Sequence, residues 1–401
     1  MPMPIESKSV SEVEALMMDL YNQEMPLVKR GEAWPFSGGP DTEEISKRAV
    51  TIFGGLVHLP KMEDTKMLSA ATFEEDLVNN WLPYFSAPEG AGGVTTTGGT
   101  ESILFAVHAA LDKARRAGKD TRGAEIIAAD TAWIALEKAA RIFQLDIKRV
   151  PLNDNLQMDV EKAREAVTDR TVLIFASAPS FHYATLDDIE GLGAVAKEND
   201  IWLHVDACSG GMLVPFLRRA GRDIPPCDFA AEGVSSLSAD SHKFGYSYPG
   251  CSLLFFRDQQ DLENAQFDDL GPPIMEPAPY TGLTGTKPVG PVAAAWAVMQ
   301  LLGDKGYEAI AAKISKGIDT ICEGVSKIDG VHIYNDPKHS LLGFQLEDPG
   351  KMMEVFGHLA FAGWVGVPIM KPEGAFNMFV SYGQADKVDQ FLEKLKFALE
   401  Q

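Results

Sequence analysis

Short apolar runs alternate with amphipathic segments from Val94 onward. The runs have the length of buried strands and lie at Val94–Thr97, Glu125–Ala129, Ile147–Val150, Thr171–Ala176, Ile201–Ala207 and Ser252–Phe256. Between them, apolar residues recur at helical spacing around residues 103–111, 135–143, 159–167 and 186–198. This alternation predicts an α/β protein with a sheet covered by helices on both faces.

The two ends of the chain differ from this alternating middle. The N-terminal part predicts a helix over Val10–Tyr21, an irregular stretch through Pro40, a helix from Asp41 to Phe53 and another beginning near Thr72. After residue 290, a long helix over Val292–Leu302 should precede strands near residues 331–334, 341–345 and 376–380 and helices near 351–362 and 385–399. We therefore expect an N-terminal arm and helices (1–70), a large domain (71–290), and a linking helix with a small C-terminal α/β domain (291–401).

The composition indicates which kinds of binding partner the protein is not built for. The formal net charge is −21 and the pI is about 4.8, which argues against general binding to nucleic acid or to an anionic membrane. The four cysteines have no paired short spacing that suggests zinc or a disulfide framework, as expected in a reducing cytoplasm. The start of the sequence lacks a signal peptide, and no apolar run is long enough for a transmembrane anchor.

One lysine has an unusual setting. Lys243 follows the small and hydroxyl residues of Leu237–Ser241, with His242 before it and Gly245 after it, where the backbone can turn sharply. We expect an amine in such a pocket to have a lowered pKa and to form a Schiff base with a carbonyl, here that of pyridoxal 5'-phosphate (PLP). A surface lysine after a buried strand is the alternative.

Two further motifs favour the cofactor reading. Gly98 and Gly99 precede the helix near residue 103, so free backbone N–H groups there could hold a phosphate, although a plain tight turn is the simpler reading of the pair alone. Asp206 ends a central apolar strand, where a carboxylate could keep the pyridine nitrogen of PLP protonated, and the small Ala207 could lie against the ring. A turn or helix-cap aspartate is the other reading of Asp206.

Three motifs in one order carry a family resemblance: Thr97–Ser102, His204–Gly211 and Ser236–Tyr246. Together they resemble the PLP-dependent group II decarboxylase family of fold type I, and within it the sphingosine-1-phosphate lyases. The resemblance implies an aspartate-aminotransferase-like fold with a mostly parallel seven-stranded sheet in the large domain.

The resemblance also implies roles for single residues. Lys243 would be the Schiff-base lysine, Asp206 the pyridinium partner and Ala207 the residue beside the ring. The rest of the implied cofactor-binding set is Gly98, Gly99, Thr100, Trp133, Ser180, Asp240 and His242. Thr286 would reach the phosphate from the other subunit, so the resemblance implies a homodimer with shared active sites.

The departures from the family fall on substrate-facing positions. Trp133 stands where the family has a ring-stacking histidine, Tyr183 where the lyases often have histidine, Pro249 where they have lysine and Lys287 where they have arginine. An indole can stack on the cofactor but cannot take up a proton as histidine does. These changes leave the substrate amine open.

The arginine distribution bears on the reaction. No arginine occurs after Arg257, so the C-terminal part cannot supply the bidentate clamp with which many PLP enzymes hold an α-carboxylate. This weakens an aminotransferase reading and is compatible with cleavage of an amino alcohol that has no α-carboxylate, or with decarboxylation. The leading hypothesis is a retro-aldol carbon–carbon lyase, with Tyr183, Tyr246 and Lys243 as candidate proton carriers. Tyr246 has packing as its alternative role. An amino-acid α-decarboxylase and a PLP-binding homologue without useful catalysis are the alternative functions.

Overall fold

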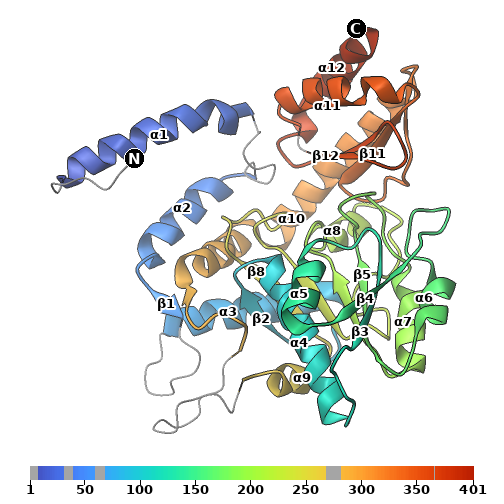
Figure 1. The fold of residues 1–401 in the computed structure, drawn as a ribbon. Coiled ribbons are helices and arrows are strands. Elements are labelled where there is room, and N and C mark those ends of the chain that lie inside the picture. Colours follow the sequence, from blue (N-terminus) through green and yellow to red (C-terminus); the bar gives the residue numbers. More distant parts are fainter. Residues whose placement is uncertain (1–7, 31–38, 59–67, 268–280, 365) are drawn as a thin grey trace.

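A seven-stranded sheet forms the larger part of the protein in the computed structural model, which describes residues 8–30, 39–58, 68–267, 281–364 and 366–401 (Figure 1). The strand order is β2-β8-β7-β6-β5-β3-β4, and within it β8 alone runs antiparallel to its neighbours. The strands are β2 (Gly92–Thr96), β3 (Glu125–Ala129), β4 (Asp146–Val150), β5 (Thr171–Ser177), β6 (Trp202–Asp206), β7 (Ser236–Ala239) and β8 (Ser252–Phe256). The predicted fold class is confirmed.

Both faces of this sheet are buried. Successive residues of one strand enter different cores: Ile126 packs in one apolar cluster and Ile127 in the other. This explains why the strands read as continuous apolar runs rather than as alternating ones. The helices of this part are α3 (Leu68–Trp81), η1 (Leu82–Phe85), α4 (Gly99–Arg116), α5 (Ala135–Phe143), α6 (Val160–Ala166), α7 (Ile189–Glu198), α8 (Val214–Arg219) and α9 (Gln259–Asn264).

A second sheet lies in the C-terminal unit, by which we mean residues 331–401. Its antiparallel order is β10-β11-β13-β12, with strands β10 (Val331–Ile333), β11 (Leu341–Leu346), β12 (Gly366–Ile369) and β13 (Ala375–Phe379). The helices are η2 (Pro349–Lys351), α11 (Met352–Phe361), η3 (Ala385–Lys387) and α12 (Val388–Glu400). Strand β12 was missed from the sequence because Pro368 argues against a central strand, but β12 is an edge strand, where proline is tolerated.

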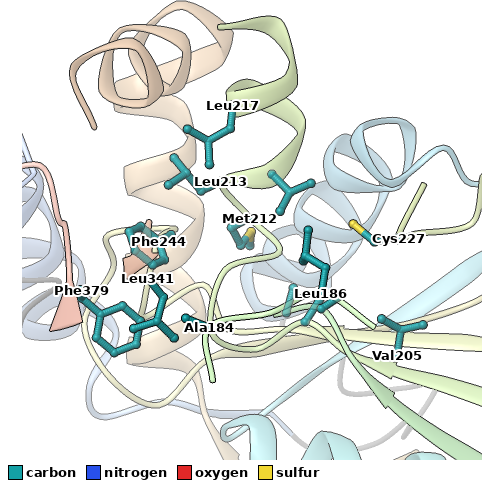
Figure 2. Packing of buried hydrophobic residues seen from close by; sticks show 14 of the residues in the cluster. Ala184, Leu186, Val205, Met212, Leu213, Leu217, Cys227, Phe244, Leu341 and Phe379 are labelled. Carbon is teal, nitrogen blue, oxygen red and sulfur yellow. The ribbon is translucent and has the colours of Figure 1, made fainter. Parts of the chain in front are cut away.

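The long helix α10 (Val289–Val325) joins the two parts and begins next to the predicted boundary at residues 290 and 291. Its helical geometry is interrupted at Gly303 (φ 53°, ψ −172°), directly after the predicted end at Leu302, and a second helical part with buried apolar residues continues to Val325. Figure 2 shows Leu341 and Phe379 of the C-terminal unit in the same apolar cluster as Phe244 and Ala184. The two sheets therefore share a packed interface.

The N-terminal segment contains α1 (Val10–Arg30), α2 (Thr42–Phe53) and β1 (Val57–His58), which pairs with β9 (Lys287–Pro288). Helix α2 packs on α10, whereas α1 projects away from the body (Figure 1). The prediction of an irregular stretch from residue 22 was wrong as far as Arg30, because α1 continues to that residue. Its part over residues 31–38 lies outside the described residues. Among the described residues, no helix combines the length and apolar character needed to cross a bilayer.

Candidate active site

A cavity of about 670 Å³ opens at the carboxyl edge of the large sheet. Its wall comes from segments that follow β2, β3, β5, β6 and β7, and from residues just before β8. Open α/β sheets bind ligands at this edge, because the loops after neighbouring strands converge there. Eight of the predicted site residues line this cavity: Gly98, Gly99, Thr100, Trp133, Asp206, Asp240, His242 and Lys243. Pro249, where the lyases have lysine, lines it as well.

Lys243 lies in this cavity directly beside a carboxylate. Its Nζ atom is 2.9 Å from Oδ2 of Asp240. Burial alone would lower the pKa of the amine, but the carboxylate of Asp240 raises it above its ordinary value. The expectation of a lowered Lys243 pKa was therefore wrong, because it left out this ion pair.

Asp206 and Asp240 are both buried, but the pKa of Asp206 is raised and that of Asp240 is lowered. Burial raises the pKa of Asp206, opposed by the Cys208 N–H, which donates to Oδ1 at 3.0 Å. For Asp240, burial would also raise the pKa, but Lys243 and His242 lower it. The Oδ1 atom of Asp240 has no hydrogen-bond partner among the described residues, so this carboxylate retains capacity for a further polar contact.

The start of helix α4, residues 98–101, lines the cavity and is called the α4 cradle below. Gly98 precedes the helix and Gly99 begins it, so the backbone N–H groups of the first turn have no intrahelical partner. A Cβ atom on Gly99 would lie 2.6 Å from Sγ of Cys208 and 2.9 Å from Oδ1 of Asp240. Only glycine therefore fits at residue 99 without a shift of its neighbours. His242 stands opposite, with Nδ1 donating to the Cys251 carbonyl at 2.7 Å.

Glu101 fixes the geometry of this cradle and was not singled out from the sequence. Its carboxylate accepts hydrogen bonds from the N–H and hydroxyl of Thr97, each at 2.7 Å, and from the Leu283 N–H at 3.1 Å. Burial would raise the pKa of Glu101, but these bonds lower it. Glu101 thus ties the start of α4 to the segment that leads to Thr286.

The donor set of the cavity fits PLP. An amine that can react with an aldehyde, a buried carboxylate at the end of a central strand and N–H groups at a helix start all face one space. These are the groups needed for the aldehyde, the pyridine nitrogen and the phosphate of this cofactor. The volume is within the range of small-molecule sites.

An aromatic wall bounds the other side of the cavity. Trp133 lies edge-to-face with Phe181, with ring centroids 5.1 Å apart, and Phe181 is 5.6 Å from Phe379. Trp133 is the most exposed of the three and Phe379 the most buried. Phe379 belongs to β13 in the C-terminal unit, and no signal in the sequence linked it to the site.

Five predicted site residues do not line the cavity: Ser180, Tyr183, Ala207, Tyr246 and Thr286. Ala207 is buried, and its N–H donates to the Ser238 carbonyl. Ser180 is buried with its hydroxyl lacking a partner among the described residues. Thr286 is exposed.

The two tyrosines have other surroundings. Tyr246 is buried, its hydroxyl accepts a hydrogen bond from the Tyr382 N–H at 3.2 Å, and burial raises its pKa. Tyr183 lies edge-to-face with Tyr334 at 6.5 Å, and burial raises its pKa as well. Neither tyrosine lines the cavity that contains Lys243.

Comparisons with known proteins agree with the geometry of the site. Residues 40–347 match the family model described as the pyridoxal-dependent decarboxylase conserved domain. The chain is 33% identical over 308 residues to a sphingosine-1-phosphate lyase of Oryza sativa subsp. japonica, which covers 76% of this chain and 56% of that protein. It is 32% identical over 271 residues to a probable L-tyrosine/L-aspartate decarboxylase of Methanocorpusculum labreanum, covering 68% of this chain and 71% of the relative.

The fold has a close counterpart among solved structures. A sphingosine-1-phosphate lyase of Burkholderia pseudomallei superposes with a TM-score of 0.90 at 28% identity, covering 100% of this chain and 92% of that one. By contrast, the matches span only 56% of the Oryza sativa lyase and 67% of a sphingosine-1-phosphate lyase of Arabidopsis thaliana, which is 30% identical over 380 residues. The chain thus spans about half to two thirds of the length of those relatives.

Proposed function

This chain belongs to the pyridoxal-dependent decarboxylase family, and we propose that within it the protein is a carbon–carbon lyase. The proposed reaction is a retro-aldol cleavage of an amino alcohol, phosphorylated or not, to an aldehyde and an amine. The similarity to sphingosine-1-phosphate lyases supports this reaction class. The observation that carries the proposal is Lys243, which lies on one cavity wall with Asp206 and the α4 cradle.

PLP supplies an electron sink for the carbon that loses its bond. Lys243 would hold the aldehyde carbon, and Asp206, at the end of β6, would keep the pyridine nitrogen protonated. Gly98, Gly99, Thr100 and His242 would bind the phosphate, with Trp133 beside the ring. The raised pKa of the buried Asp206 does not oppose this role, because proximity to a ring cation favours the carboxylate form.

The chain must also move a proton from the substrate hydroxyl. Lys243 is the proposed carrier, since its amine lies in the cavity and Asp240 can share its proton at 2.9 Å. Tyr183 and Tyr246 are weaker candidates, because they stand outside the cavity wall. For Tyr246 the buried position and the bond from Tyr382 support packing as its role.

The charges around the cavity favour an amino alcohol over an amino acid. Among the described residues of the wall, Lys243 is the one lysine or arginine. A bidentate guanidinium is the usual partner of a substrate carboxylate, and the wall described here offers none. The aromatic wall instead suits an apolar part of the substrate.

An α-decarboxylase is the second candidate. The similarity to a probable L-tyrosine/L-aspartate decarboxylase favours it, and loss of CO2 does not require a strong clamp on the departing group. In that reaction the same Lys243, Asp206 and α4 cradle would act, with CO2 leaving in place of the aldehyde.

Product analysis separates these reactions. PLP-loaded protein is incubated with a 3-hydroxy amine, with its phosphate ester, and with a set of amino acids, beside a Lys243→Ala control. We expect a trapped aldehyde from at least one amino alcohol and no product with the control variant. Release of CO2 from an amino acid would establish the decarboxylase instead, and no turnover of any amine would leave a PLP-binding homologue without useful catalysis.

We also propose a homodimer with shared active sites. Thr286 is exposed and does not line the cavity of its own chain, which supports its use by a partner subunit. Helix α1 carries exposed apolar residues, among them Val13, Leu16 and Met17, a pattern that marks an interaction surface.

Mixing two inactive variants tests this arrangement. Lys243→Ala and Thr286→Asp are each expected to be inactive alone. A hybrid dimer would contain one site with both native residues, so mixing should restore part of the activity. If Thr286 acted within its own chain, no mixture would regain activity.

A cytoplasmic location is the last part of the proposal. The four cysteines are free thiols in the structure, and three of them are buried, which is typical of proteins from a reducing compartment. Cell fractionation with a tagged full-length chain tests this, and recovery in the membrane or external fraction would contradict it.

A further inference from the structure

Side chains of the C-terminal unit donate hydrogen bonds to the loop that carries part of the aromatic wall. This loop, residues 178–188, connects β5 to α7 and contains Phe181 and His182. Asn377 of β13 donates from Nδ2 to the carbonyls of both residues, at 2.8 Å in the case of His182. Asn377 has no exposed surface, so water cannot replace these bonds.

The orientation of the Asn377 amide is fixed by a third contact. Its Oδ1 atom accepts a hydrogen bond from the Val367 N–H of β12 at 3.1 Å. A flipped amide would place its NH2 group against that N–H and its oxygen against the two loop carbonyls, so all three contacts would be lost. The side chain therefore has one orientation, and it transmits the position of the β12–β13 pair to the loop.

Two further side chains of the C-terminal unit hold the same loop at Ala184. Asn335 donates from Nδ2 to the Ala184 carbonyl at 2.8 Å, and His339 donates from Nε2 to the same oxygen at 2.9 Å. Ala184 has φ 59°, an unfavourable conformation for a residue with a Cβ atom. The two donors offset this local cost and hold the loop in one conformation.

Two residues of the loop, His182 and Phe181, contact the segment that contains Trp133. His182 donates from Nδ1 to the Thr131 carbonyl at 3.1 Å, and Phe181 packs edge-to-face on Trp133. Thr131, Trp133 and Phe181 all line the cavity. A continuous set of contacts thus runs from β13 through the loop to Trp133 in the cavity wall, while Phe379, two residues after Asn377, lines the cavity directly.

We propose that Asn377 is a positioning residue that sets the aromatic wall of the active site, so that placement of the C-terminal unit controls the shape of the cavity. The inference rests on the proposed use of this cavity for PLP and an amine. Asn377 itself would contact neither PLP nor the amine. It would act through Phe181, His182 and Trp133.

The test uses Asn377→Asp in the full-length protein. This variant keeps the side-chain size and the acceptor for Val367, but an ionised carboxylate has no donor and a protonated one has a single donor. Gln384→Glu is the matched control, because Gln384 is also a buried amide and its bonds to Ser381 and Gly363 involve no residue of the loop. His182→Leu removes the later link to Thr131 and serves if Asn377→Asp does not fold.

The main readout is acrylamide quenching of Trp133, obtained as the difference between each protein and its Trp133→Phe counterpart before PLP is added. We expect quenching to rise about twofold or more in Asn377→Asp, because loss of the hydrogen bonds to the loop lets the loop open locally and exposes Trp133. Quenching should stay unchanged in Gln384→Glu. The PLP dissociation constant, followed by absorbance, should rise about tenfold in Asn377→Asp. His182→Leu should shift both quantities in the same direction.

Unchanged quenching in both Asn377→Asp and His182→Leu would overturn the proposal, whatever the loss of stability. Equal effects in Asn377→Asp and Gln384→Glu would do so too, since they would indicate general destabilisation. Neither measurement requires turnover of a substrate. The role of Asn377 can therefore be tested even if the proposed lyase reaction proves wrong, and the two failures can be told apart.

Discussion

The half-buried amine of Lys243 and the buried carboxylate of Asp240 form an ion pair, with Nζ and Oδ2 separated by 2.9 Å. The pair raises the pKa of Lys243 and lowers that of Asp240, in each case against the effect of burial. A protonated amine is a poor nucleophile, so Asp240 holds Lys243 in its less reactive form until the pair is broken. Asp240 is thus part of the chemistry of the lysine and is more than a wall residue.

Asp240→Asn is expected to shift the reactivity of Lys243 to lower pH. Without the carboxylate, burial dominates and the amine pKa falls, so more of the neutral amine is present at pH 7. The rate at which PLP-free protein takes up the cofactor, followed by absorbance across pH, measures this. A profile that coincides with that of the wild type would mean that Asp240 does not control the amine, and Lys243→Ala supplies the baseline.

Gly99→Ala should damage the α4 cradle more than a typical surface change. The new methyl group would overlap Sγ of Cys208 and Oδ1 of Asp240. Overpacking of this kind costs about 1–3 kcal/mol of unfolding free energy, and we expect the affinity for PLP to fall roughly tenfold or more because the cradle is displaced.

Gly357→Ala is the control for this substitution. Gly357 lies in α11, and a Cβ atom there has no neighbour within 4 Å. Removing a helical glycine should stabilise the protein by about 0.5–1 kcal/mol and leave PLP binding alone. PLP affinity of Gly99→Ala equal to that of the wild type would contradict the assignment of the cradle.

The parts of this site that follow single strands could be predicted from the sequence. Asp206 ends the buried strand β6 and Lys243 follows β7 by four residues, so their place at one sheet edge follows from the parallel arrangement of these two strands. Six of the seven strands could be predicted from their runs, whereas β7 (Ser236–Ala239) contains two serines and the number seven was implied only by the family resemblance. Continuous apolar runs leave little doubt when both faces of a strand are buried.

Contacts between residues far apart in the chain could not be predicted from the sequence. Phe379 and Asn377 lie nearly two hundred residues after the loop that they contact, and periodicity carries no information about such pairs. The raised pKa of Lys243 was missed for a different reason. Asp240 is only three residues away, but whether the two side chains meet depends on the turn after β7, which the local pattern did not reveal.

His339→Gln is expected to flatten the acid dependence of stability. Burial lowers the pKa of His339 to about 4, whereas an unfolded histidine has a pKa near 6.5. Between these values the unfolded state binds more protons, so the free energy of unfolding falls as the pH decreases, by up to about 3 kcal/mol for this group. The glutamine variant lacks this contribution.

Urea titrations at pH 7 and pH 4.5 measure the effect as a difference between the variant and the wild type. His204, whose burial lowers its pKa to about 3, contributes in the same direction, and Asp187, whose burial raises its pKa to about 6, contributes in the opposite direction. Both are present in the two proteins and cancel in the comparison. Parallel pH profiles of wild type and His339→Gln would show that His339 does not titrate on unfolding.

Glu101→Gln should loosen the segment that leads to Thr286. The two carboxylate oxygens accept bonds from Thr97 on one side and from Leu283 and Thr284 on the other. An amide has one acceptor oxygen, so its NH2 group must face donors on one side, which costs about 1–3 kcal/mol for the groups left unpaired. Because Glu101 has a lowered pKa in the folded protein, its contribution is present above the unfolded pKa and is lost as the pH falls.

Hydrogen exchange at pH 7 locates this loss. We expect faster exchange at residues 281–288 in Glu101→Gln, while the strand at residues 171–177 retains its protection, because the substitution breaks bonds to the segment and not to the sheet. If the segment closes a partner's site through Thr286, the variant should also bind PLP more weakly as a dimer. Unchanged exchange at residues 281–288 would mean that other contacts hold this segment, and that Glu101 serves only the Thr97 turn.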